Sequence, residues 1–142
     1  MMRACVLGVA LLACACAPQS NGGALPAPTP DEVSLRITEA QNGERIEAVI
    51  GERFAVELIG VPTAGYEWTP AQLPPFLTRA GEATGDTIRE QSERGYAGGN
   101  HWEVLMFVAT EAGEGELVLE QRRPWETEQP AADVFRVTIA AR

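Results

Sequence analysis

The residue types that most often carry enzymatic chemistry are sparse in this 142-residue chain. The one histidine, His101, lies in a β-prone segment, and Asn100 and Glu103 are its only polar neighbours in sequence that could orient it. Nucleophilic catalysis needs a nucleophile, a base and a group that orients the base. Neither Ser34 nor Ser92 lies in the sharp strand-to-helix turn that exposes a nucleophilic serine. We therefore predict that the protein is not an enzyme.

Metals, cofactors and nucleic acids are also poor matches to this composition. One histidine and scattered carboxylates show no metal-ligand spacing, and no glycine-rich loop is suited to cradle a phosphate. The net charge is −9, so no basic patch can neutralise the phosphates of a nucleic acid. We expect no metal, no cofactor and no nucleic-acid partner.

One segment combines stiff, small and aromatic residues in a way that suits a binding loop. It carries, in order, Pro62, Thr63, Ala64, Gly65, Tyr66 and Trp68. The proline fixes one backbone torsion, the glycine permits a positive φ, and the small residues between them let the backbone approach a partner closely. The alternative interpretation is an ordinary β-turn followed by a core tryptophan.

Two further segments have a similar character. The second contains paired glycines, which mark a tight turn or a bulge: Tyr96, Ala97, Gly98 and Gly99. The third places an aromatic ring beside a proline: Arg123, Pro124 and Trp125. Tryptophan and arginine are the residues most enriched among interface hot spots. A contact of Trp125 with a small satellite core is the alternative.

Alternating apolar and polar residues predict the strands that must hold these segments. Period-two alternation and β-branched or aromatic content mark six strands, within residues 33–38, 46–50, 53–58, 102–109, 116–120 and 134–139. Residues 87–95 are too polar for a helix face and are predicted as a loop or an edge strand. No stretch shows a helical period, and turn signals recur between the strands. The pattern predicts an all-β fold, an immunoglobulin-like antiparallel β-sandwich.

The N-terminal residues predict export. Arg3 and the apolar run 4–13 form a secretory signal that is too short to span a bilayer of about 30 Å. The sequence Leu-Leu-Ala-Cys ending at Cys14 resembles a lipoprotein cleavage box, so Cys14 is the expected lipid anchor and Cys16 is the second candidate. An ordinary signal peptide is the alternative. We expect a periplasmic or cell-surface lipoprotein that contacts a bacterial membrane through this lipid only.

The remaining chain predicts one domain on a tether. Residues 1–13 are the expected signal peptide, residues 14–30 form a tether rich in proline, glycine and alanine, and residues 31–142 have the size of one domain. The three cysteines, Cys5, Cys14 and Cys16, all precede this domain. The domain therefore has no disulfide and depends on burial for its stability. We expect a monomer.

In order and spacing, the three segments resemble the chagasin-like inhibitors of papain-type cysteine proteases. The signature of that family is Asn-Pro-Thr-Thr-Gly-aromatic-x-Trp, then Gly-x-Gly-Gly, then Arg-Pro-Trp or Arg-Pro-Phe. The third motif is complete here. The first two depart from the signature, because Val61 replaces the asparagine, Ala64 replaces the second threonine and Tyr96 replaces the first glycine of the second motif.

The resemblance implies a sandwich whose three loops lie side by side at one end and enter the protease cleft together. It implies that Thr63 lies nearest the catalytic thiolate, that Trp125 covers one wall of the cleft, and that Gly98 and Gly99 lie against the other. The implied protease-binding residues are Pro62, Thr63, Ala64, Gly65, Tyr66, Trp68, Ala97, Gly98, Gly99, Arg123, Pro124 and Trp125. A lipoprotein of the same fold that binds a non-protease partner is the alternative hypothesis.

Overall fold

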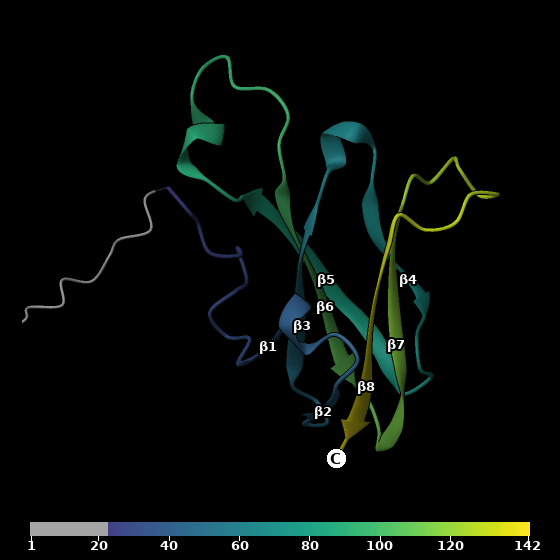
Figure 1. Cartoon of the computed structure of the whole chain (residues 1–142). Coiled ribbons are helices and arrows are strands. Elements are labelled where there is room, and N and C mark those ends of the chain that lie inside the picture. The colour runs from purple at the N-terminus through teal and green to yellow at the C-terminus, as the bar shows by residue number, and fades with distance from the viewer. Residues whose placement is uncertain (1–22) are drawn as a thin grey trace, which may run out of the picture.

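The computed structural model describes residues 23–142, and the expected signal peptide and lipid anchor lie outside the described residues. Two four-stranded sheets face each other as a sandwich (Figure 1). The strands are β1 (Leu35–Thr38), β2 (Arg45–Ala48), β3 (Arg53–Gly60), β4 (Glu67–Gln72), β5 (Leu77–Asp86), β6 (His101–Ala109), β7 (Gly113–Arg122) and β8 (Asp133–Ala141). Residues 23–142 contain no α-helix, and the short 3-10 helices are η1 (Glu39–Gln41), η2 (Pro62–Ala64) and η3 (Arg89–Ser92). The predicted all-β sandwich is confirmed.

The strand pairing is mostly antiparallel, with two parallel exceptions. One sheet has the order β1-β3-β6-β5 and the other has the order β2-β8-β7-β4. β1 runs parallel to β3, and β2 runs parallel to β8. The predicted antiparallel sandwich holds for the other strand pairs, and the two parallel edge pairs were not foreseen. The physical reason is that the chain passes from β1 to β2 in the other sheet before β3 begins, so no hairpin joins either parallel pair.

The core lies between the sheets and is built around three phenylalanines. Phe54 and Phe107 are at most 1% exposed, and their ring centroids are 5.7 Å apart. Phe135 from the other sheet is fully buried. On β3 the inward residues Val56 and Leu58 follow Phe54 at period two, which confirms the alternation predicted for this strand.

Two strands, β4 and β5, were not predicted from the sequence. β4 contains Pro70 and lies at a sheet edge, where a missing backbone N–H is tolerated. β5 is rich in polar and small residues, including Gly81 and Gly85, and it is held by pairing with β6 along its length. Tertiary pairing overrides weak β-propensity in both. Residues 87–95 form a loop that contains η3, and not an edge strand.

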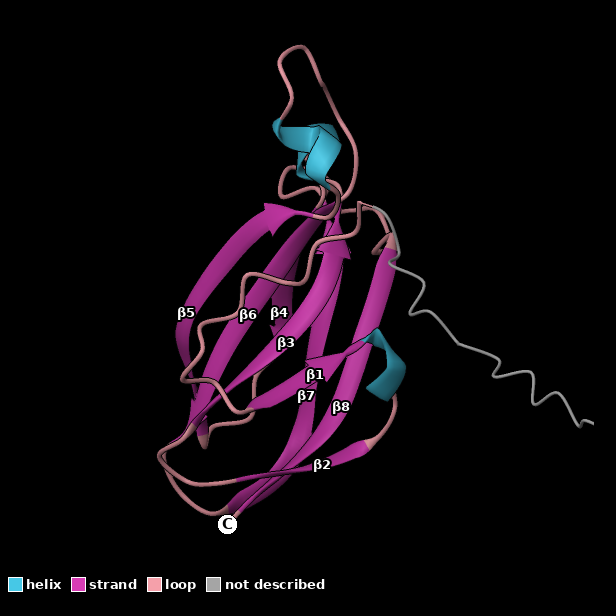
Figure 2. Cartoon of the chain, turned by 90° about the vertical axis from the view of Figure 1, so that its left-hand side faces the viewer, coloured by secondary structure: helices cyan, strands magenta, loops and turns pink. Residues whose placement is uncertain are grey.

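The prediction that residues 14–30 form a free tether is wrong for residues 24–30, which pack on the domain. Figure 2 shows this segment crossing the outer face of the sheet formed by β1, β3, β6 and β5. Ala27 and Thr29 are 8% and 7% exposed. The indole nitrogen of Trp102 donates a hydrogen bond of 2.9 Å to the carbonyl of Leu25. The Thr29 hydroxyl donates to the carboxylate of Glu57.

The reason for this docking is the composition of the outer face. Ala55, Val104 and Met106 point away from the main core and form a second apolar cluster with Ala27 and Val33. An uncovered cluster of this kind would expose apolar area to water, so covering it stabilises the fold. Alternation along β3 and β6 did not show that both of their faces are buried.

Candidate functional site

The three sequence motifs lie at one end of the sandwich, which we call the loop end (Figure 1). The first loop, residues 61–66, joins β3 to β4. The second loop, residues 87–100, joins β5 to β6, and the third loop, residues 123–132, joins β7 to β8. In Figure 1 the first loop stands between the other two. The side-by-side arrangement implied by the family resemblance is therefore present.

The first loop is closed by its own backbone. The carbonyl of Val61 accepts the N–H of Ala64 at 3.0 Å and the N–H of Tyr66 at 3.3 Å, and the carbonyl of Pro62 accepts the N–H of Gly65 at 2.9 Å. Gly65 has a φ of 81°, in the left-handed region that favours glycine. The loop thus forms a compact 3-10 turn although the asparagine of the family signature is replaced by valine.

The third loop fastens onto the first. The six-membered ring of Trp125 lies so close to Gly65 that a Cβ added there would be 2.3 Å from the ring carbon Cη2. The guanidinium Nε of Arg123 donates a 2.9 Å hydrogen bond to the carbonyl of Ala64. The same guanidinium stacks 4.5 Å above the ring centroid of Tyr66, a cation–π contact. These contacts join the first and third loops into one unit.

Charge within the third loop holds this unit in place. Arg123 Nη1 lies 3.0 Å from a carboxylate oxygen of Glu126 and donates a hydrogen bond to it. This hydrogen bond raises the pKa of the Arg123 guanidinium above its ordinary value. The side chain therefore bridges the two loops as a permanent cation, and a change of pH near neutrality leaves the bridge intact.

The tip of the unit is exposed and largely uncharged. Trp125 keeps 67% of its surface exposed, and Pro62, Thr63, Ala64 and Pro124 are also exposed. The satellite-core interpretation of Trp125 is excluded by this exposure. A large aromatic ring held rigidly in water is typical of a hot spot of a protein interface.

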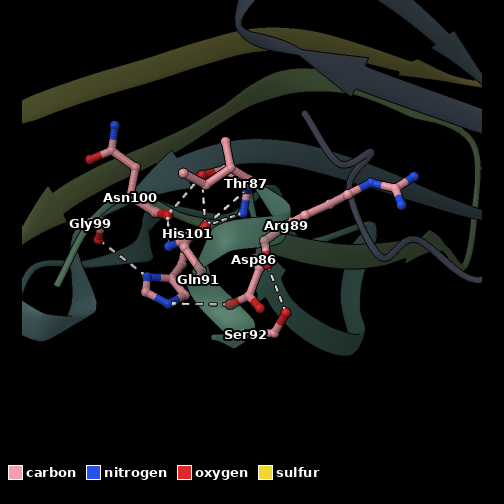
Figure 3. Close-up of polar contacts among 9 residues, drawn as sticks. Asp86, Thr87, Arg89, Gln91, Ser92, Gly99, Asn100 and His101 are labelled. Atoms are coloured by element: carbon pink, nitrogen blue, oxygen red, sulfur yellow. Dashed lines mark hydrogen bonds and ion pairs between the residues drawn. The ribbon is translucent and has the colours of Figure 1, made fainter. Parts of the chain in front are cut away.

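The second loop is organised around Gln91 (Figure 3). The side-chain oxygen of Gln91 accepts the N–H groups of Thr87 at 2.6 Å and Ile88 at 3.0 Å. Its amide nitrogen donates to the carbonyl of Asn100 at 2.8 Å, so one side chain ties the start of the loop to its end. The paired glycines have φ values of 84° (Gly98) and 94° (Gly99), in the left-handed region that favours glycine. They lie in irregular backbone and not in the predicted tight turn, because the turn of this loop is at Arg94 and Gly95. Ala97 is exposed beside the paired glycines.

His101 lies at the end of the second loop, and among the described residues no hydroxyl or thiol is hydrogen-bonded to its ring. Its Nδ1 lies 3.2 Å from the carbonyl of Gly99, and its Nε2 lies 3.7 Å from a carboxylate oxygen of Asp86 (Figure 3). The hydroxyl of Ser92 donates to the carbonyl of Arg89. Residues 23–142 also contain no group of three side chains that could hold a metal ion, and no helix among them is long and apolar enough to cross a membrane.

Trp68 is the predicted site residue that the structure removes from the binding surface. It lies in β4, is 5% exposed, and donates its indole N–H to the carbonyl of Ile59 at 2.9 Å. A side chain buried to this extent cannot reach a partner, so the prediction that it binds the protease directly is corrected. Of the alternative interpretation, an ordinary β-turn followed by a core tryptophan, the part that concerns Trp68 is right.

Sequence reasoning missed two residues that shape the loop end, Gln91 and Glu103. Glu103 accepts the N–H of Trp68 at 2.8 Å, and burial is the main cause that raises the pKa of its carboxyl. A signal for it was present, since Glu103 shares its parity on β6 with the core residues Leu105 and Phe107. A charge at an inward position of an apolar strand marks a special role. Gln91 had no comparable signal.

Taken together, the described residues form a rigid β-sandwich that presents three preformed loops at one end, which defines a binding protein of the inhibitor type. Residues 47–139 match the family described as chagasin family peptidase inhibitor I42. The chain belongs to this family. It is therefore an inhibitor of cysteine proteases and not an enzyme, and the alternative of a non-protease partner is not favoured.

Known proteins with similar sequence or structure agree with this assignment. The chain is 30% identical over 91 residues to Amoebiasin-1 of Entamoeba histolytica, a match that covers 64% of this chain and 84% of the relative. Its fold is similar to the crystal structure of a cysteine protease inhibitor of Entamoeba histolytica, with a TM-score of 0.65, 16% identity, and coverage of 80% of this chain and all of the other. The solution structure of amebosin is similar with a TM-score of 0.59, 27% identity, and coverage of 76% and 97%.

Proposed function

We propose that the protein acts as a monomer that blocks papain-like cysteine proteases by inserting its loop end into the active-site groove. In this proposal Thr63, at the exposed tip of η2, lies over the catalytic cysteine. Trp125 packs against one wall of the groove, and the backbone of Gly98 and Gly99 lies along the other. The observation that carries the proposal is the fastening of Trp125 and Arg123 onto the first loop.

Preorganisation gives the proposal its physical basis. A loop that is already in its bound shape loses little conformational entropy on docking, so more of the contact energy contributes to affinity. The first loop is closed by three backbone hydrogen bonds and covered by the Trp125 ring. Entry through a tight 3-10 turn also keeps the backbone of residues 62–64 away from the extended shape of a cleaved substrate.

The test is a titration of papain with the purified domain, residues 23–142. We expect reversible tight-binding inhibition with one inhibitor per enzyme. Thr63→Arg should weaken inhibition by at least about 100-fold, because a long charged side chain at the tip cannot enter the groove without losing its hydration. Trp125→Ala should weaken it by roughly 10- to 100-fold, as expected for a central aromatic anchor.

The matched control is Val49→Ala, which removes another exposed apolar side chain, 54% exposed, outside the loop end. It should leave inhibition unchanged. All three variants should retain the thermal midpoint of the wild type within a few degrees, because none of the three side chains is buried. A wild-type domain that leaves papain fully active at micromolar concentration would refute the proposal.

We further propose that the protein is exported and held at a bacterial membrane by a lipid on Cys14. The support is the sequence Leu-Leu-Ala-Cys at the end of a short apolar run. Metabolic labelling with a radioactive fatty acid tests it. We expect label in the wild type and in Cys16→Ser, and loss of label in Cys14→Ser. Label that persists in Cys14→Ser and disappears in Cys16→Ser would assign the anchor to Cys16.

A further inference from the structure

Glu103 lies behind the first loop and belongs to none of the three family motifs. It is on β6, where its side chain points between the two sheets in line with Leu105 and Phe107, and it is 9% exposed. A carboxylate at such a position costs free energy unless it is paired or has a role. Its contacts show what that role can be.

The carboxyl of Glu103 touches both ends of the first loop. Gly60 is the last residue of β3, directly before the loop, and a Cβ added there would lie 1.7 Å from Oε1 of Glu103 and 2.5 Å from its Cδ. Trp68 follows the loop on β4, and its backbone N–H donates to Oε2 of Glu103 at 2.8 Å. Because residue 60 is a glycine, there is space for the Glu103 carboxyl beside it. The carboxyl then accepts the backbone N–H of Trp68 at the other end of the loop.

One oxygen of this carboxyl remains without a hydrogen-bond partner. Oε1 of Glu103 is buried and unpaired within the described part of the chain. The residue lines a cavity of about 350 Å³ between β4, β5 and β6, next to Pro62 of the first loop. An unpaired carboxylate oxygen in this position weakens the fold, but a leucine in the same space would leave the Trp68 N–H without its acceptor. The acceptor for Trp68 is therefore what the glutamate supplies at this position.

Several charged groups face this carboxyl. Burial raises its pKa first, and the carboxylates of Glu67 on β4 and Glu82 on β5 raise it further. His101 on β6 and the hydrogen bond from the Trp68 amide lower the pKa. Arg79 on β5 lines the same cavity but pairs with Glu82 at 2.9 Å. No cation among these groups makes an ion pair with Glu103.

We propose that Glu103 is a positioning residue for the first loop. Its carboxyl lies between Gly60 and the Trp68 amide and fixes the distance between the two ends of the loop. That distance sets how far Thr63 projects from the loop end. The inference rests on the proposed function, because this projection matters only if the tip enters a groove. Burial favours the protonated carboxyl, so ionisation places a poorly solvated charge beside the loop base. We expect the position of the carboxyl, and with it the first loop, to shift as the carboxyl ionises.

Papain inhibition by paired variants tests the contact between Gly60 and Glu103. Gly60→Ala should weaken inhibition by about 30-fold or more, because the new methyl group expels the carboxyl and strains the loop base. Glu103→Ala should weaken it by about tenfold through the lost amide acceptor. The double variant should be no weaker than Glu103→Ala alone, since the methyl group then enters vacated space. Additive losses in the double variant would overturn the proposal.

The conservative variant separates positioning from folding. Glu103→Gln keeps the shape and the acceptor for Trp68, so its inhibition constant should stay within about threefold of the wild type at acidic pH. The ratio of the two constants, in which the protease's own pH dependence cancels, should favour the glutamine variant increasingly as pH rises. The control Glu111→Gln, which removes an exposed carboxylate outside the loop end, should show no such trend. A ratio that stays constant with pH would count against the inference.

A measurement without protease distinguishes failure of this inference from failure of the proposed function. Amide NMR shifts of the wild-type domain are followed from about pH 4 to about pH 8. The amides of Ala64, Gly65 and Trp68 should share one titration, which is absent in Glu103→Gln and present in the control Glu111→Gln. If the wild type does not inhibit papain but this titration is seen, the function fails and the positioning stands. If papain is inhibited but only the Trp68 amide titrates, the positioning role is wrong.

Discussion

The first and second loops stand beside each other at the loop end but are stabilised in different ways. The first loop, residues 61–66, is short, closed by its own backbone, covered by Trp125 and supported from within by Glu103. The second loop, residues 87–100, is longer, and the side chain of Gln91 connects its two ends. Its centre is mostly exposed, including Tyr96 at 43%.

The base of the second loop depends on a segment far away in sequence. The N–H of Leu25 donates to the carbonyl of Thr87 at 2.8 Å, and the N–H of Arg89 donates to the carbonyl of Gly23 at 2.9 Å. Ala24 forms an isolated β-bridge with Ile88. This N-terminal segment precedes residues 47–139, the part that matches the family. The contacts described for the first loop lie within residues 47–139, whereas the second loop is also held by residues 23–25, which lie outside that range.

The largest expected effect tests the rigidity of the first loop. Gly65→Ala should weaken papain inhibition by roughly 100-fold. The added Cβ would lie 2.3 Å from Cη2 of Trp125 and would displace the ring, and the alanine would have to adopt a positive φ. Inhibition constants are the measurement. The control is Gly51→Ala, which has a φ of 83° and open space around its Cβ, outside the loop end. It bears the same backbone strain and should retain inhibition.

Removal of the N-terminal segment tests the second loop. A chain that begins at Asp31 lacks Ala27 and Thr29, which cover the outer face of the sheet that contains β3 and β6. It also lacks the backbone groups that hydrogen-bond to Thr87 and Arg89. We expect inhibition about tenfold weaker and a free energy of unfolding lower by about 2 kcal/mol, the scale of a few lost hydrogen bonds and one small apolar contact. Titration of papain and denaturant unfolding measure the two effects. Unchanged inhibition would show that the second loop needs no support from this segment.

A side-chain deletion within the second loop should have a smaller effect. Gln91→Ala removes the acceptor of the Thr87 and Ile88 amides and the donor to Asn100. We expect inhibition to weaken by roughly threefold to tenfold, with a stability loss of about 1 kcal/mol. The exposed neighbour Glu93→Ala serves as the control. If Gln91→Ala matched the loss caused by Gly65→Ala, the two loops would be equally dependent on rigidity.

The smallest expected effect is the pH dependence that Glu103 gives to stability. Burial raises its pKa above the ordinary value of 4.5, so the folded protein keeps a proton that the unfolded chain releases. The free energy of unfolding due to this group therefore falls as pH rises from the ordinary value through the raised one, and is constant above it.

Denaturant unfolding of the wild type and of Glu103→Gln at several pH values measures the contribution of Glu103 to the free energy of unfolding. The stability of the glutamine variant relative to the wild type should increase by roughly 1 kcal/mol between acidic and neutral pH, the scale of one poorly paired buried polar group. A relative stability that decreases with pH would mean that the ionised carboxylate is the better-accommodated form.

Local patterns in the sequence were sufficient for most of the strands and for the three motifs. Alternation placed Phe54, Val56 and Leu58 on the core face, and the proline and glycine of the first motif indicated a tight turn. The same reasoning missed β4 and β5, because a strand that contains Pro70 or several glycines is stabilised by its neighbour and not by its own residues. It also assigned Trp68 to the surface, since a motif gives the order of residues but not their burial.

By itself the sequence determined the all-β class, the lack of catalytic chemistry in the domain and the family of the inhibitor, because periodicity, residue type and motif order are local properties. Only the tertiary structure decided that residues 24–30 belong to the domain, that Trp125 covers Gly65, and that Glu103 reaches both ends of the first loop. Each of these facts joins residues that are distant in the chain. Contacts of this kind depend on how the sheets pack, and no local pattern specifies that packing.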